Sequence, residues 1–143
     1  MPYRFMEDIA IADVAFQAWG KTREELFSSA TDALLNVMVT ELETVREAEE
    51  VEIRLENHHL DMLLFDLLNE LLFYKDSRLL LLRVKRARID LCDAGYTIRA
   101  SARGERIDPA RHALSVDVKA VTLHRFKVEE TAEGWRSVVV LDI

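Results

Sequence analysis

RFKVEETAEGWRSVVVL (residues 125–141) consists of two strand-like runs joined by a short turn. The hydrophobic period is mostly two over Arg125–Glu130 and Trp135–Leu141, which is the period of a β-strand. The turn between them, Ala132–Glu133–Gly134, is too short for the crossover that parallel neighbours require. This stretch therefore predicts an antiparallel hairpin near the C-terminal end of the chain.

More strands are predicted on the N-terminal side of this hairpin. The period is also mostly two over Leu80–Ala87, Tyr96–Gly104 and Ser115–Thr122. Earlier in the chain, the predicted strands are Tyr3–Met6, Ala12–Trp19 and Val45–Leu55. The second half of the chain is therefore a run of strands with short turns.

Two helices are predicted between the early strands. Thr22 and Glu25 have the spacing of a capping box, and apolar residues follow at helical spacing to about Thr40. Leucine pairs recur every four residues over about His59–Lys75 and give the second helix a broad apolar stripe. The order of elements predicts an α+β fold, with two helices packed on a mainly antiparallel β-sheet or sandwich. We expect a single domain over residues 1–143, because no linker or repeat divides the chain.

The composition is that of a small globular protein with an acidic surface. Half of the 143 residues are hydrophobic, and the net charge is −7. Because nucleic-acid binders gain most of their affinity by neutralising phosphates, this charge argues against binding RNA alone. The single cysteine, Cys92, cannot form an internal disulfide and favours a reducing cytoplasm. No stretch of the sequence resembles a signal peptide or a membrane span.

Charged residues in apolar surroundings are the best indication of chemistry. The sequence has no glycine-rich phosphate loop, no paired-cysteine zinc pattern and no helix with two histidines around a glutamate. Asp13 lies in a small, apolar run, where a buried carboxylate needs a hydrogen bond or a cation. Asp142 follows a valine-rich run and is the penultimate residue. In Asp117–His124, strand alternation places Asp117 and Lys119 on one face.

At these residues the sequence resembles the archease family. Archease chains carry an aspartate between small and apolar residues near the N-terminus and a late strand of Glu-Val-Lys-Ala-Val/Ile-Thr-Tyr-His type. They end on an aspartate followed by one apolar residue. The matching stretches here are Ala12–Asp13–Val14, Asp117–His124 and Val140–Ile143. Supporting matches are Ala18–Phe27, Leu68–Phe73, Gly104–Glu105 and Arg111–His112.

The resemblance implies a protein that activates an enzyme and is not an enzyme itself. On this resemblance, the chain assists an RtcB-type, GTP-dependent RNA ligase in tRNA splicing or RNA repair, by promoting guanylylation and multiple turnover of the ligase. It would contact tRNA only through the ligase. The family's essential acids correspond to Asp13 and Asp142, with a divalent cation, commonly calcium, near them. The family's important lysine corresponds to Lys119, which is expected to pair with the acids or to contact a nucleotide phosphate.

Further candidates lie close to these residues in sequence or match family positions. Asp8 lies upstream of the first acid, and Ile143 is the apolar residue after the second. His112 and His124 match family positions and are expected either to bond locally or to belong to the site. The family's usual N-terminal histidine is replaced here by Ala10, so the role of that histidine does not carry over.

Two other classes of function remain open on the sequence. One is a stand-alone metal-dependent hydrolase with Asp13 and Asp142 as ligands, although such enzymes usually need more ligands and a base. The other is a chaperone-like scaffold protein, which the acidic surface and small size suggest. An enzyme would turn over a substrate without the ligase, whereas an activator would act only in its presence.

Overall fold

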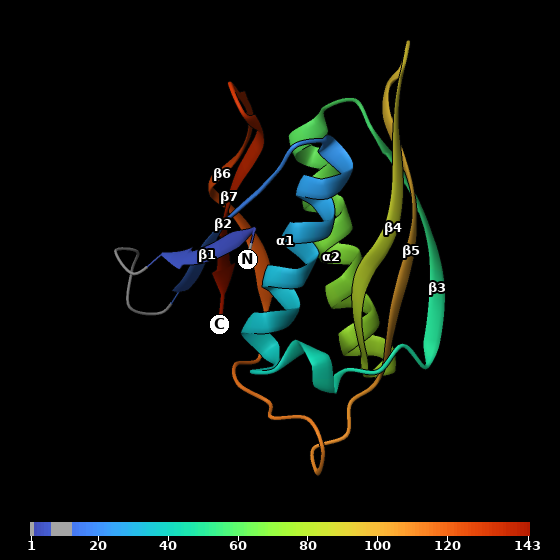
Figure 1. Ribbon diagram of the computed structural model, residues 1–143, viewed down its shortest axis with the longest axis vertical. Coiled ribbons are helices and arrows are strands. Elements are labelled where there is room, and N and C mark those ends of the chain that lie inside the picture. Colours follow the sequence, from blue (N-terminus) through green and yellow to red (C-terminus); the bar gives the residue numbers. More distant parts are fainter. Residues whose placement is uncertain (1, 7–12) are drawn as a thin grey trace.

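Two antiparallel sheets enclose a layer of two helices (Figure 1). A computed structural model describes residues 2–6 and 13–143. Its elements in chain order are β1 (Tyr3–Met6), β2 (Asp13–Gly20), α1 (Arg23–Met38), the short 3-10 helix η1 (Leu42–Thr44), β3 (Glu49–Asn57), α2 (Leu60–Arg78), β4 (Leu80–Cys92), β5 (Gly95–Arg106), β6 (Ala120–Thr131) and β7 (Gly134–Asp142). One sheet has the strand order β1-β2-β7-β6, and the other has the order β3-β5-β4.

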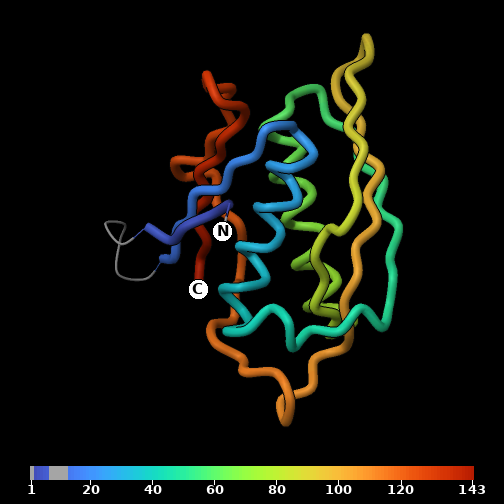
Figure 2. Tube along the Cα trace, in the orientation of Figure 1, coloured from blue at the N-terminus to red at the C-terminus, as the bar shows by residue number. Residues whose placement is uncertain are grey.

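The predicted α+β class and the C-terminal hairpin are confirmed. Strands β6 and β7 pair antiparallel, with Thr131 opposite Gly134 at the turn. Strand β7 also pairs antiparallel with β2, so strands from the two ends of the chain form the middle of one sheet. The trace in Figure 2 runs from the blue N-terminal strands to the red C-terminal strands beside them.

The prediction of separate strands over Ser115–Thr122 and Arg125–Glu130 is wrong, because a single strand, β6, begins only at Ala120 and continues without a break to Thr131. A register shift between Thr122 and Lys127 interrupts its pairing with β7. Within this shift, the backbone of Arg125 is left-handed, with φ of 55°. The sequence pattern cannot distinguish such an irregularity from a break between two strands, because both interrupt the alternation.

Residues 115–119 are irregular and belong to no strand. One of their backbone amides bonds to the end of α1 and not to a strand: the Ser115 amide donates to the Met38 carbonyl at 2.8 Å. Asp117 and Lys119 therefore do not lie on a strand, but the alternation expected for them is kept in their exposure. Val118 between them is fully buried, whereas both charged residues are exposed.

Other boundaries move by a few residues for local reasons. Helix α1 ends at Met38 because Val39 is extended and pairs with Leu114. Helix α2 continues beyond the predicted end and stops at Leu79, whose left-handed backbone (φ 56°) cannot extend the helix. Strand β3 starts later than predicted because η1 and its flanking residues occupy the segment before it.

The predicted capping box starts α1. The Thr22 hydroxyl accepts a hydrogen bond from the Glu25 amide at 3.1 Å, and the Glu25 carboxylate accepts one from the Lys21 amide at 2.8 Å. These bonds satisfy amides at the helix start that no helical carbonyl reaches. The helix can therefore begin directly after β2 and return along the inner face of its sheet.

Both helices are buried on more than one side, because a sheet covers each face of the helical layer. Neither helix in the described part of the chain is long and apolar enough to cross a membrane. The leucine pairs of α2 belong to the core as predicted, and the largest fully buried side chains of the two helices are Leu26, Phe27, Leu34, Leu35, Leu63, Leu64, Leu67 and Leu68. The inner faces of both sheets therefore pack against the helices and contribute to the core.

We predict that Gly104→Ala strongly destabilises the fold. An added Cβ would lie 1.7 Å from the backbone oxygen of Leu81 on the neighbouring strand β4, so β4 and β5 would have to separate. The free energy of unfolding should fall by about 3 kcal/mol in urea denaturation. Arg99→Ala on the exposed face of the same strand is the control and should change it by about 0.5 kcal/mol or less. Equal losses in the two variants would refute this explanation.

Candidate functional site

Asp13 and Asp142 lie directly opposite each other in the antiparallel ladder between β2 and β7. The Cβ atoms of residues paired in this way are about 4.5–5.5 Å apart, and their side chains share one face of the sheet. Val14, the neighbour of Asp13, packs against the core, so alternation turns this acid pair (Asp13 and Asp142) to the outer face of the sheet. Asp13 is half-buried and Asp142 is exposed.

The acid pair carries two like charges side by side. Like charges directly opposite each other destabilise a sheet, and the register of β2 and β7 sets Asp13 opposite Asp142. Two carboxylates on one face at opposed positions can share a cation. A positive charge bound beside the acid pair would therefore relieve the repulsion between the two carboxylates.

Lys119 reaches the same end of the sheet through its backbone. Its amide donates a hydrogen bond to the Asp142 carbonyl at 2.8 Å, and the next residue, Ala120, pairs with Asp142 as β6 begins. The Lys119 side chain is exposed. The three residues that the sequence singles out thus come from the start of β2, the end of β7 and the segment just before β6.

The other candidates lie elsewhere or outside the described residues. Asp8 and Ala10 fall in the part of the chain that the structure does not describe. Ile143 is half-buried and packs against the core. His124 is exposed within the register shift of β6. His112 is buried in a separate polar cluster.

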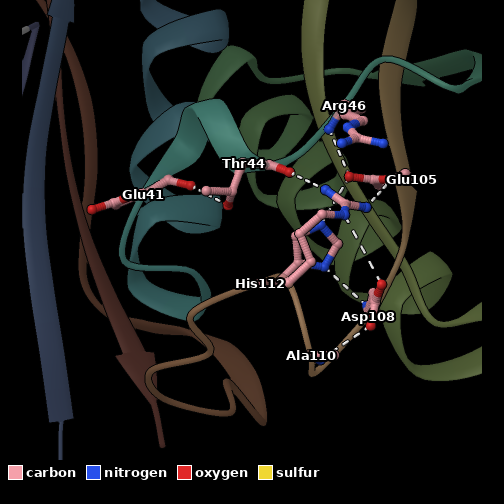
Figure 3. A network of polar contacts seen from close by, with 8 residues as sticks. Glu41, Thr44, Arg46, Glu105, Asp108, Ala110 and His112 are labelled. Carbon is pink, nitrogen blue, oxygen red and sulfur yellow. Dashed lines mark hydrogen bonds and ion pairs between the residues drawn. The ribbon is translucent and has the colours of Figure 1, made fainter.

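That polar cluster centres on Glu105 at the end of β5 (Figure 3). One carboxylate oxygen accepts hydrogen bonds from the Arg46 amide at 2.8 Å and from His112 Nε2 at 2.9 Å. The other accepts from Arg111 at 2.5 Å, and Arg111 also donates to the Thr44 carbonyl at 2.6 Å. The cluster therefore ties the loop after β5 to the end of β5 and to the chain around η1.

The bonding of His112 fixes its tautomer. Its Nδ1 atom accepts from the Asp108 amide at 2.9 Å, so the proton of the neutral ring is on Nε2, which donates to Glu105. The hydrogen bond from Arg111, followed by those from Arg46 and His112, outweighs burial and lowers the pKa of Glu105 to about 2. Of the two roles expected for His112, the structure thus favours local bonding.

Two other surface features lie away from the acid pair. Arg54, Arg99 and Arg88 form a row across the exposed face of the β3-β5-β4 sheet, where Asp90 pairs with Arg88 and Glu50 pairs with the nearby Arg103. A hollow of about 960 Å³ lies at the opposite end of the β2–β7 ladder, where Trp19, Trp135 and the β6–β7 turn contribute to its lining. Neither member of the acid pair lines this hollow.

Comparison with known proteins covers nearly the whole chain. A family model described as the archease protein family (MTH1598/TM1083) matches residues 3–143. The chain belongs to the archease family. The resemblance expected from the sequence is therefore confirmed.

Relatives and solved structures agree with this assignment. Protein archease of Methanopyrus kandleri is 37% identical over 143 residues, which is 100% of both chains. Protein archease of Pyrococcus abyssi is 35% identical over 92% of this chain and 93% of its own. The solution structure of protein 1598 from Methanobacterium thermoautotrophicum covers 99% of each chain, with a TM-score of 0.85 and 31% identity. A Thermotoga maritima crystal structure described as "an archease, possible chaperone" shares the fold, with a TM-score of 0.63 and 20% identity.

The Glu105 cluster is the feature of this archease chain that reasoning from the sequence did not assemble. The signal was present, because Gly104–Glu105 and Arg111–His112 are among the stretches that match the family. Their pattern did not indicate that the two stretches bond to each other, nor that Arg46 and Thr44 join them. These contacts depend on how the loop after β5 folds back.

We predict that Glu105 stabilises the protein in a pH-dependent way. Its pKa is lower in the folded state than the usual 4.5, so its contribution is complete above pH 4.5 and is lost as the pH falls towards about 2. Glu105→Gln should lower the free energy of unfolding by about 2 kcal/mol at pH 7, because charge-assisted hydrogen bonds are lost. In urea denaturation, the difference from wild type should shrink steadily between pH 4.5 and pH 2.5. A difference that stays constant over this range would contradict the assignment.

Proposed function

We propose that this archease chain is a protein cofactor that activates a GTP-dependent RNA ligase, by promoting guanylylation and multiple turnover of the ligase in tRNA splicing or RNA repair. The observation that carries the proposal is the in-register pairing of Asp13 with Asp142, with the Lys119 amide bonded to Asp142. The resemblance to archeases noted in the sequence implies the reaction, and the juxtaposition supports the proposal because it gives these residues a common location. The proposal places the protein in the cytoplasm, with RNA contacted only through the ligase.

The donors of the acid pair fit a divalent cation in part. Carboxylate oxygens are hard ligands of the kind that calcium and magnesium prefer. Two carboxylates are too few for the six to eight oxygens that calcium takes, and the described residues contain no group of three or more potential ligands. Asp13 and Asp142 would therefore hold the cation together with water, backbone carbonyls or groups of a partner. A bound divalent cation would supply positive charge that neutralises the two facing carboxylates.

Lys119 adds a positive charge, carried at the end of a flexible side chain, next to the acid pair. Its exposed ammonium can pair with a carboxylate of the acid pair or with a phosphate brought by a partner. Phosphoryl-type transfer depends on neutralising charge that develops on oxygen atoms. An exposed, incompletely coordinated site suits an activator that docks on an enzyme, and it suits a self-contained hydrolase less well.

We predict that the isolated protein binds calcium or magnesium through the acid pair. In calorimetric titration, Asp13→Asn and Asp142→Asn should each weaken binding about tenfold or more. Without divalent ions, both variants should be as stable as wild type or slightly more stable, because each removes a like-charge contact. Asp93→Asn, in the exposed β4–β5 turn, is the matched control and should leave binding unchanged. Undiminished binding in the Asp13→Asn, Asp142→Asn double variant would rule out the metal assignment.

We also predict that activation of the ligase depends on Asp142 and Lys119. In a GMP-transfer assay with the cognate ligase, Asp142→Asn and Lys119→Ala should each reduce stimulation about tenfold or more, as expected for loss of a charged group that acts directly. Asp93→Asn should stimulate as wild type does.

The outcomes of this assay separate the proposals. Full stimulation by folded Asp142→Asn would remove that residue from the site. No effect of the wild-type protein on the ligase would overturn the activator function. Turnover of a phosphate ester by the protein alone would favour the hydrolase.

A further inference from the structure

Lys75 is a buried lysine near the end of α2 that the proposed function does not yet use. Its relative exposure is 6%, although lysine is among the residues least often buried. Its ammonium contacts Asp117 Oδ1 at 2.6 Å, the Val118 carbonyl at 2.9 Å and Asp76 Oδ1 at 2.8 Å. A lysine ammonium has three donor hydrogens, and these contacts account for all of them.

The contacts keep Lys75 charged in spite of its burial. Burial lowers the pKa of Lys75, but the hydrogen bonds and charges of Asp117 and Asp76 outweigh burial, so the pKa is raised. The position near the C-terminal end of α2 also favours a cation, because the unpaired carbonyls there carry partial negative charge. Lys75 is therefore a fixed positive charge that faces the irregular segment before β6.

Lys75 holds that segment immediately before the proposed site. Among the described residues, its side chain is the only one that bonds to Asp117 or Val118. The next residue is Lys119, whose amide donates to the Asp142 carbonyl. The first part of the segment is held separately, by hydrogen bonds from the Ser115 and Val116 amides to carbonyls at the end of α1. The last part therefore depends on Lys75 and on the burial of Val118.

We propose that Lys75 is a positioning residue of the site formed by Asp13, Asp142 and Lys119: it clamps Asp117–Val118 so that Lys119 lies beside Asp142, immediately before β6. Its activity readout rests on the proposed function, whereas its structural readout does not. Asp117 then serves the clamp, and its carboxylate binds the Lys75 ammonium. A purely structural lysine would stabilise the whole fold and would not act on this one segment.

Three variants distinguish these roles. Lys75→Met removes the ammonium and keeps the apolar stem, and it leaves no buried unpaired charge because the Asp117 side chain is 80% exposed. Asp117→Ala removes the clamped partner and leaves Lys75 in place, which keeps the proposal testable if Lys75→Met does not fold. Asp76→Ala is the matched control, because Asp76 also contacts Lys75 but lies on α2 and not in the clamped segment.

The structural test is amide hydrogen exchange of the isolated protein, measured residue by residue. Lys75→Met and Asp117→Ala should accelerate exchange of the Lys119 amide about tenfold or more, while amides in the β2–β7 ladder keep their wild-type rates. Asp76→Ala should leave the Lys119 amide within about twofold of wild type. Unchanged exchange at Lys119, or an equal acceleration throughout the β2–β7 ladder, would overturn the positioning role.

The functional test is a double-mutant cycle in the GMP-transfer assay. If Lys75 acts through Lys119, Lys75→Met should lower stimulation, and adding it to Lys119→Ala should cause no further loss. Additive losses would overturn action through Lys119. If Lys119→Ala stimulates as wild type does, the proposed role of Lys119 in activation fails, and the exchange rates alone decide whether Lys75 positions the segment.

Discussion

The antiparallel pairing of β2 with β7 is the contact on which the rest of the structure depends. It joins strands from opposite ends of the chain and places both in the middle of the four-stranded sheet. On the inner side of this ladder, Phe16 and Val139 pair with each other and are completely buried against the helical layer. The same register that buries these side chains sets Asp13 opposite Asp142 on the outer side. A slip of one residue would exchange the two faces, so core packing fixes the geometry of the acid pair.

Buried charges hold both ends of the long connection from β5 to β6. At its start, Glu105 gathers donors from Arg111, His112 and the chain near η1. At its end, Lys75 binds Asp117 and the Val118 carbonyl. Removing one partner from such a cluster costs more than the interaction itself contributes, because the remaining polar groups lose their hydrogen bonds. The connection has no regular structure over residues 115–119, yet it is anchored near Glu105 and again within that stretch.

The acid pair differs from these clusters in a way that bears on function. Glu105 and Lys75 each form an ion pair with an oppositely charged residue of the chain. Asp13 and Asp142, in contrast, lie opposite a like charge. Unfavourable interactions such as this like-charge contact are expected at functional sites, where some stability is lost so that a ligand or partner can bind. The site is also on an outer sheet face, so relieving its repulsion requires no change in the core.

The sequence by itself determined the kinds of element, most of their order and the residues most worth attention. Hydrophobic period identified both helices and the C-terminal hairpin, and the capping box located the start of α1, because these signals arise from neighbours within a few residues. The unusual settings of Asp13 and Asp142 were also visible locally. The likeness to the archease family singled out Lys119 and implied the function that is proposed above.

Only the tertiary structure decided which of these residues meet. Asp13 and Asp142 lie near opposite ends of the chain, and period two is the same for every register of two strands. The break at residues 115–119 and the clamp by Lys75 were likewise hidden, because hydrogen bonds to α1 and α2 override the local strand pattern. The single strand β6 was hidden because its register shift interrupts the alternation as a break would. Lys75 appeared in the sequence only as the end of an apolar stripe, and its bonds to Asp117 and Val118 exist because the fold brings α2 against the segment before β6.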